Sequence, residues 1–137
     1  MKIKKQPKII KPCTECFNPQ YFKFNFTYME NIEHIEAQYK VQMLSRMIEL
    51  SKSSFLSVSG FSKNIGFETE DISKLRFKKD IPHLFATRFS AKDYKNKLTI
   101  VRLYTNDNPI LGRIIGVLIN KVFYILFVDI GGKSYSH

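Results

Sequence analysis

Apolar and polar residues alternate along the first patterned stretch of the chain, YFKFNFTY at residues 21–28. A period of two over this length predicts a half-buried strand, with one face formed by Phe22, Phe24, Phe26 and Tyr28. The preceding residues 1–19 carry five lysines and three prolines without a regular period. This composition indicates a flexible basic arm.

The period changes to that of a helix over residues 31–55. Asn31 is a candidate N-cap, and the serine cluster at 51–54 is expected to end the helix. A short helix or turn is expected to follow, up to Gly60. The predicted core stripe consists of Ile32, Ile35, Tyr39, Met43, Met47 and Leu50, widened by Leu44 and Ile48.

The second half of the chain is typical of an antiparallel sheet. Short strands are expected near 74–78 and 85–90, a longer one at 97–105, and a turn at 106–109 (NDNP). A hairpin is predicted from strands at 112–119 and 122–129, joined by Asn120-Lys121. The last strand is apolar on both faces, which predicts a central position. Its expected faces are Phe123, Ile125 and Phe127 on one side and Val122, Tyr124, Leu126 and Val128 on the other.

These elements predict an α+β fold of the order β-α(-α)-β-β-β, with an antiparallel sheet of four or five strands packed by one main helix. Residues 20–137 are expected to form a single domain behind the arm. The sequence contains no charge-free apolar run of about 18 residues and begins without the apolar region of a secretory signal. We therefore expect a cytoplasmic protein without membrane contact.

The net charge of +10 favours polyanionic partners, either RNA or another nucleic acid, or an acidic protein. Residues 74–97 carry eight basic and two acidic residues, interleaved with aromatic side chains. This combination suits single-stranded nucleic acid, although a solvated edge with the aromatic rings in the core is the alternative. The candidate nucleic-acid-binding residues are Lys74, Arg76, Lys78, Lys79, Arg88, Arg102 and Arg113.

Three side chains are candidates for proton transfer: His83, Tyr135 and His137. For each histidine the alternative is a structural or solvated position. Cys13 and Cys16 form a C-x-x-C pair without a second pair, so two reduced thiols are the favoured interpretation. No metal or other cofactor is expected.

The order of elements, the basic charge and the polar tail with Tyr135 and His137 resemble the RelE-superfamily toxins, small ribonucleases of bacterial toxin–antitoxin pairs. The resemblance is topological and covers residues 21–137. It implies a metal-independent endoribonuclease and an acidic antitoxin as partner. In that reaction a 2′-hydroxyl attacks the adjacent phosphate, Arg and Lys stabilise the developing charge, and His or Tyr moves protons.

A second resemblance is to a group of small proteins from bacteria and their mobile elements, a group with no established activity. The matching segments are FNFTY at 24–28, MLSRMIELS at 43–51, LRF at 75–77, GRIIGV at 112–117, FYILFVD at 123–129 and Tyr135. The chain departs from the group's D-P-x-H motif, because Gly132 stands at the position of its histidine. The group implies a mobile-element or phage-defence setting.

The leading hypothesis is therefore a small basic nucleic-acid-binding protein, with a RelE-like endoribonuclease toxin as its enzymatic form. The alternative is a non-enzymatic interaction protein from a mobile element, which binds a nucleoprotein complex or an acidic protein partner.

Overall fold

The computed structural model describes residues 21–30, 32–54, 58, 60, 66–74, 81–105 and 110–131. The predicted arm with Cys13 and Cys16, the N-cap Asn31, the turn at 106–109 and the tail from Gly132 lie outside these residues. No helix in the described ranges is long and apolar enough to cross a membrane.

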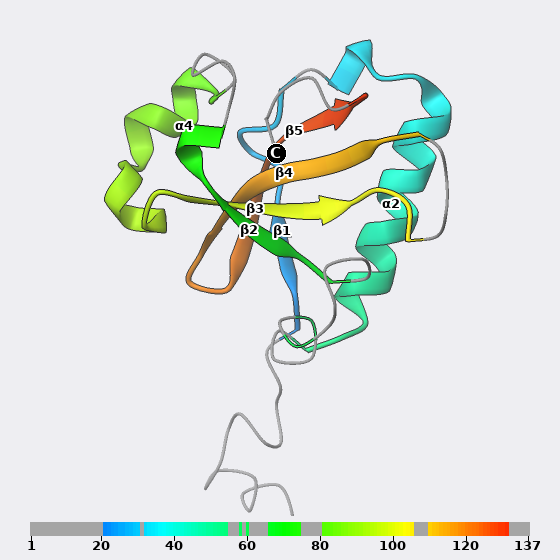
Figure 1. Ribbon diagram of the computed structural model, residues 1–137, viewed down its shortest axis with the longest axis horizontal. Coiled ribbons are helices and arrows are strands. Elements are labelled where there is room, and N and C mark those ends of the chain that lie inside the picture. Colours follow the sequence, from blue (N-terminus) through cyan, green and yellow to red (C-terminus); the bar gives the residue numbers. More distant parts are fainter. Residues whose placement is uncertain are drawn as a thin grey trace, which may run out of the picture.

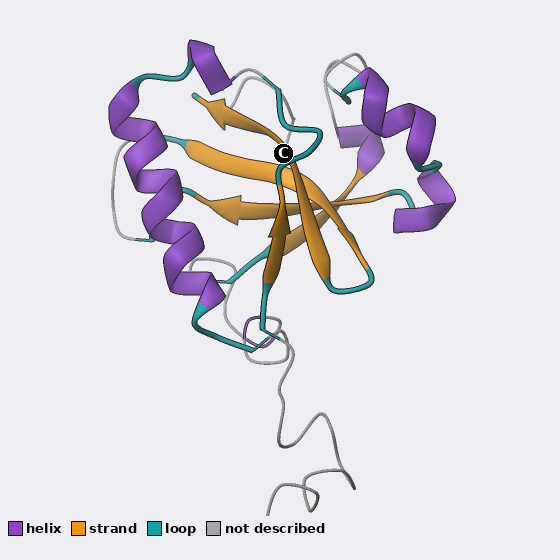
Figure 2. Ribbon diagram, turned by 180° about the vertical axis from the view of Figure 1, so that it is seen from behind, coloured by secondary structure: helices purple, strands orange, loops and turns teal. Residues whose placement is uncertain are grey.

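The described strands form a five-stranded sheet in the order β1-β5-β4-β3-β2, with α2 (Ala37–Ser51) on one face (Figures 1 and 2). The short helices α4 (His83–Arg88) and η6 (Ala91–Tyr94) pack against the other face. The predicted α+β class with one main helix is confirmed. The sheet is mixed rather than antiparallel, because the edge strand β1 (Lys23–Asn25) pairs in parallel with the start of β5.

The hairpin of β4 (Gly112–Ile119) and β5 (Val122–Ile130) forms the centre of the sheet, as predicted. Its turn residues Asn120 and Lys121 both have positive φ, at 52° and 66°, which is the conformation of a type I′ turn. On the other side of β4 lies β3 (Lys97–Arg102), which agrees with the strand predicted at 97–105.

A β-bulge in β5 changes the predicted faces of this strand. Ile115 pairs with Phe127 and Gly116 with Ile125, so Leu126 is an extra residue opposite β4. Phe123 and Ile125 face α2, whereas Phe127 packs on the opposite side with Leu126. The prediction that Phe127 shares the face of Phe123 is therefore wrong, because the bulge shifts the alternation by one residue.

Two apolar cores lie on the two faces of the sheet. The α2-side core consists of Phe22, Tyr39, Met43, Met47, Leu50, Val58, Val101, Leu103, Ile114, Phe123, Ile125 and Val128. The α4-side core consists of Tyr28, Phe85, Tyr94, Leu98, Ile100, Ile115, Val117, Leu126 and Phe127. Leu44 and Ile48 of the predicted helix stripe belong to neither core: they are 57% and 46% exposed. They lie on the opposite side of α2 from Met43 and Met47, so their assignment to the core was wrong.

The first predicted strand is shorter than its alternation suggested. Asn25 Oδ1 accepts a hydrogen bond of 2.9 Å from the Thr27 backbone N–H, and this turn ends β1. The chain then passes beside β5, where the Glu30 N–H donates to the Leu126 carbonyl (2.9 Å). As a result Phe26 is exposed and Tyr28 enters the α4-side core.

Two further strand predictions differ from the structure. Residues 83–88 form α4 instead of a strand, and Phe85 and Phe89, four residues apart, pack against each other. The remaining strand, β2 (Glu68–Asp71), pairs with β3 and precedes the 3₁₀ helix η4 (Ile72–Lys74). Of the strand predicted near 74–78, all but Lys74 lies outside the described residues.

Candidate nucleic-acid interface

The structure brings together two of the predicted arginines, Arg102 at the end of β3 and Arg113 near the start of β4. They are direct partners across the two strands, and Asp129 of β5 is the next partner of Arg113. The strand alternation places all three on the α4-side face of the sheet, in a row that also passes close to Glu68 of β2. Arg113 and Asp129 are each only 4% exposed, whereas Arg102 is half-buried. This arginine row is charge-balanced and largely buried.

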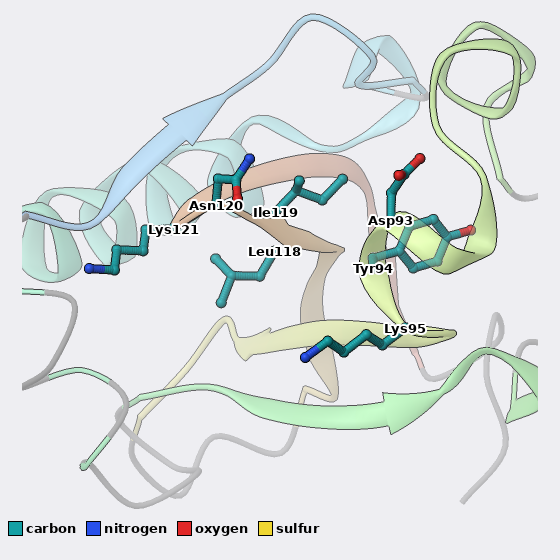
Figure 3. Close-up of a pocket in the computed structure, with 7 residues that line it drawn as sticks. All are labelled: Asp93, Tyr94, Lys95, Leu118, Ile119, Asn120 and Lys121. Carbon is teal, nitrogen blue, oxygen red and sulfur yellow. The ribbon is translucent and has the colours of Figure 1, made fainter.

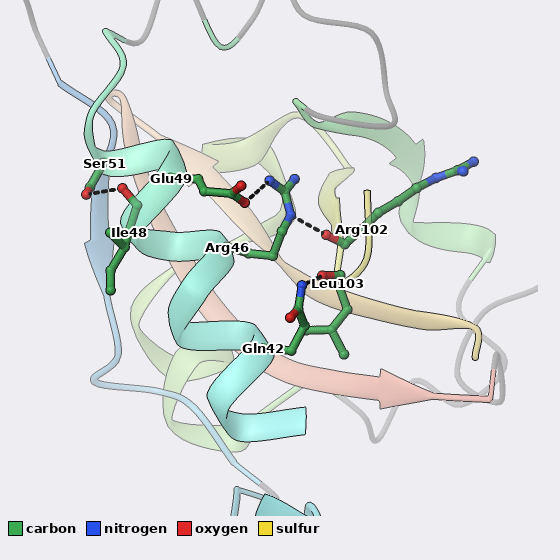
Figure 4. A network of polar contacts seen from close by, with 7 residues as sticks. All are labelled: Gln42, Arg46, Ile48, Glu49, Ser51, Arg102 and Leu103. Atoms are coloured by element: carbon green, nitrogen blue, oxygen red, sulfur yellow. Dashed lines mark hydrogen bonds and ion pairs between the residues drawn. The ribbon is translucent and has the colours of Figure 1, made fainter. Parts of the chain in front are cut away.

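The backbone of this row is fixed from the other face of the sheet by Arg46 of α2, which the sequence interpretation missed. The guanidinium is 2% exposed; its Nε donates to the Arg102 carbonyl (2.8 Å) and its Nη1 to Glu49 Oε1 (3.0 Å). Gln42, one turn earlier, donates to the Leu103 carbonyl at 2.8 Å. Figure 4 shows that these side chains clamp the end of β3 while the Arg102 side chain extends away from α2.

Arg46→Ala is expected to lower the free energy of unfolding by about 2–3 kcal/mol, because the buried Arg102 carbonyl loses a charged donor. Glu49→Gln should cost less than about 1 kcal/mol, since that carboxylate is 60% exposed. Urea denaturation of both variants measures the two effects. Equal losses would mean that the Arg46–Glu49 ion pair within α2, and not the hydrogen bond to the Arg102 carbonyl, accounts for the stabilisation.

Two other predicted residues, His83 and Arg88, lie at the two ends of α4, and both are exposed. Arg88 Nη1 donates to the Tyr28 hydroxyl (3.3 Å), and the Tyr28 ring makes edge-to-face contacts with Phe85 and Phe89. Phe85 is completely buried, and Tyr94 is 8% exposed. The alternative interpretation, in which the aromatic rings of residues 74–97 lie in the core, is therefore correct for Phe85 and Tyr94. Their rings are not available to stack on bases.

Lysines gather instead at the end of the sheet where the β4–β5 hairpin turns, and all of them are exposed except the half-buried Lys121. Lys95 and Asn96 have positive φ (55° and 58°), and this second tight turn lies beside the turn of Asn120 and Lys121. Between the two turns is an open pocket of about 330 Å³, lined by Asp93, Tyr94, Lys95, Leu118, Ile119, Asn120 and Lys121 (Figure 3). We call this region the hairpin end and define its cations as Lys23, Lys92, Lys95, Lys97 and Lys121.

The register of the strands places the other lysines of the hairpin end around this pocket. Lys23 of β1 is the partner of Val122, the residue after Lys121. Lys97 begins β3 and lies 3.9 Å from the Asp71 carboxylate. Asp93 accepts a hydrogen bond from the Ser90 backbone N–H (2.7 Å) and so caps η6. The five lysines thus outnumber the four acids of β2 and η6, which are Glu68, Glu70, Asp71 and Asp93.

The phenol of Tyr94 forms one wall of the pocket. Burial, together with the neighbouring Asp93 carboxylate, raises the pKa of Tyr94 above its ordinary value of 10.0. The phenol is therefore protonated at neutral pH, and its hydroxyl points away from Lys95 and Lys121 (Figure 3).

The raised pKa of Tyr94 predicts a loss of stability in alkaline solution. Above pH 10.0 the unfolded chain releases the Tyr94 proton before the folded chain does, so stability falls as the pH rises through the folded-state pKa. Tyr94→Phe removes this contribution. The free energy of unfolding of the variant should therefore rise relative to the wild type between about pH 9 and 11. If the difference in the free energy of unfolding between Tyr94→Phe and the wild type did not change with pH, the raised pKa of Tyr94 would be contradicted.

Several candidates remain untested predictions. Arg76, Lys78, Lys79, Tyr135 and His137 lie outside the described residues, and Lys74 ends η4. Within the described part of the chain, no group of three or more His, Cys, Asp or Glu side chains is placed to hold a metal ion. The signal for the hairpin end was present in the sequence as Lys92, Lys95 and Lys97, but the contribution of Lys121 depends on the tertiary fold.

Comparisons of the chain with protein-family models, with curated proteins and with solved structures found no match.

Proposed function

We propose that the protein binds single-stranded nucleic acid at the hairpin end. The observation that supports this most is the pocket between the two left-handed turns, which combines the Lys95 and Lys121 side chains with an apolar wall. Ammonium groups bind phosphates, and an apolar wall receives the face of a base. The net charge of +10 supports the same partner through long-range attraction.

The proposed arrangement assigns a role to each side of the pocket. The ammonium groups of Lys95 and Lys121 contact the backbone phosphates, and Lys23, Lys92 and Lys97 extend the positive potential on either side. A base lies against Ile119, which is half-buried on the same face of the sheet as Tyr94, and the Asn120 amide offers hydrogen bonds. Because the pocket is open and shallow, the strand contributes few base-specific contacts. Phosphate contacts therefore dominate the affinity.

The arginine row has a smaller part in this proposal. Arg102 and Arg113 lie among Asp129 and Glu68, and the burial of Arg113 keeps it from a polymer. We propose that the protein binds nucleic acid, and we assign no reaction to it. Of the described histidines, His34 lies beside Glu33 (3.8 Å) and His83 at the start of α4, both exposed. Cleavage by His83, Tyr135 or His137 remains part of the RelE-like hypothesis.

The test is the salt dependence of binding to a labelled single-stranded RNA and to the DNA of the same sequence. Replacing Lys95 and Lys121 together by Gln removes two proposed phosphate contacts. The slope of log K against log salt should become shallower by about 1.4, at about 0.7 per single-strand contact. The matched control replaces Lys40 and Lys52 of α2 by Gln, which removes the same charge from another surface. Equal effects of the two pairs, or no binding by the wild type at low salt, would refute the proposal.

A further inference from the structure

A row of side chains crosses the α4-side face of the sheet at the hairpin end. Lys23 of β1 pairs with Val122 of β5, and Val122 pairs with Ile119 of β4. These three residues lie on the α4 side, because the next residues of β1 and β5, Phe24 and Phe123, pack in the α2-side core. Lys23 is exposed, whereas Val122 and Ile119 are half-buried. A partly exposed apolar surface therefore joins Lys23 to the pocket.

The row continues on the other side of the pocket. Lys95 lies in the turn before β3, the strand next to β4, and lines the pocket together with Lys121 (Figure 3). From β1 to β3 there are three spacings of the sheet, so the backbones of Lys23 and Lys95 are separated by about 14 Å across the strands. Lys121, in the turn between β5 and β4, lies between them. Three cations thus follow one line across the hairpin end.

The structure limits this line at both of its ends. On one side β1 is the edge strand, so no further strand of the described sheet continues the row beyond Lys23. On the other side β2 ends with Glu70 and Asp71, and the Asp71 carboxylate lies 3.9 Å from the Lys97 ammonium group. A phosphate beyond Lys95 would therefore approach two carboxylates, which disfavours a longer bound strand in that direction.

From this geometry we infer that the hairpin end binds about four nucleotides, in a single strand that crosses the sheet at right angles to the β-strands from Lys95 to Lys23. The inference rests on the proposed function and specifies its ligand. Stacked nucleotides rise about 3.4 Å each, so about 14 Å accommodates about four of them. Four nucleotides contain three phosphate linkages, one for each of Lys95, Lys121 and Lys23. Ile119 and Val122 lie beneath the bases between these cations.

NMR titrations of the ¹⁵N-labelled full chain with uridine oligonucleotides, from the dinucleotide to the octanucleotide, test the length of the site at low salt. The affinity, measured from the amide shifts of Lys95 and Asn120, should rise steeply up to the tetranucleotide. Beyond that length it should rise only in proportion to the number of equivalent binding positions on the strand. A steep rise that continues to the octanucleotide would overturn the inference and leave the proposed function intact, whereas no binding at any length would refute both.

The variant Lys23→Gln tests the position of the site. It should lower the affinity for the tetranucleotide on the order of tenfold at low salt, because each single-strand phosphate contact contributes about 0.7 to the salt exponent. The trinucleotide has two linkages, which occupy Lys95 and Lys121, so its affinity should fall less than about twofold.

Lys40→Gln is the matched control, since it removes the same charge from α2 and should affect both lengths equally and slightly. Lys23 is exposed, so its replacement should leave the fold intact. If Lys23→Gln also weakened the two oligonucleotides equally, Lys23 would act through general attraction and not through a contact, and the assignment of β1 to the site would be wrong.

Discussion

Gly116→Ala is expected to lower the free energy of unfolding by about 3 kcal/mol or more, and Gly116→Val to prevent folding. A Cβ at this position would overlap the Tyr124 carbonyl oxygen and would lie 2.6 Å from the ring of Phe123. The backbone of β5 cannot retreat, because it is central in the sheet and holds the bulge at Leu126. Urea denaturation monitored by circular dichroism measures the loss.

Gly60→Ala is the matched control for this substitution, because a Cβ at Gly60 meets no atom of the described residues within 4 Å. Its stability should be unchanged to within about 0.5 kcal/mol or slightly higher, since alanine restricts the unfolded chain more than glycine does. If Gly116→Ala were as well tolerated as Gly60→Ala, the close approach of β4 and β5 at the bulge would be incorrect.

Phe123→Ala is expected to cost about 3–5 kcal/mol, which is a large part of the stability of a domain of this size. The ring is 1% exposed and packs against those of Phe22 and Phe24, with centroids 6.0 and 6.2 Å away. It therefore connects the edge strand β1 to the centre of the sheet on the α2 side. Its loss leaves a cavity that the rigid strands around it cannot close.

Phe26→Ala provides the comparison, because Phe26 is 47% exposed and follows β1 at the turn. This variant should lose less than about 1 kcal/mol. Thermal melts of Phe123→Ala and Phe26→Ala at equal concentration compare the two losses of stability. A similar loss in both would mean that the alternation of YFKFNFTY, and not the turn at Asn25, describes the packing of this segment.

The sequence predicted the structure best where the conformational preferences of neighbouring residues agree with the packing of the whole fold. The hairpin could be predicted because Asn120-Lys121 supplies a turn between two apolar strands, and the inner stripe of α2 because Met43, Met47 and Leu50 repeat at the helical period. The face of Phe127 could not be predicted. It depends on the bulge at Leu126, and the bulge depends on the contact of Gly116 with another strand.

The candidate site was less accessible to sequence reasoning. Residues FATRFS alternate like a strand but form part of α4, since Phe85 fills the core above the sheet while Leu84 faces solvent. Outer and inner apolar positions of α2 also look alike in sequence, so Leu44 was assigned to the core. The pocket at the hairpin end joins residues 93–95 to residues 118–121, and only the fold brings these two turns together.

The most direct test of binding at the hairpin end is an NMR titration of the ¹⁵N-labelled full chain with a short single-stranded RNA at low salt. We predict that amide shifts change most at Lys95, Asn96 and Ile119–Val122, and that salt reverses them. Amides of α2 around Val41 and Leu44, away from the hairpin end, should stay unchanged. Shifts confined to α2 or to the arginine row of Arg102 and Arg113, or no shifts at all, would contradict the account.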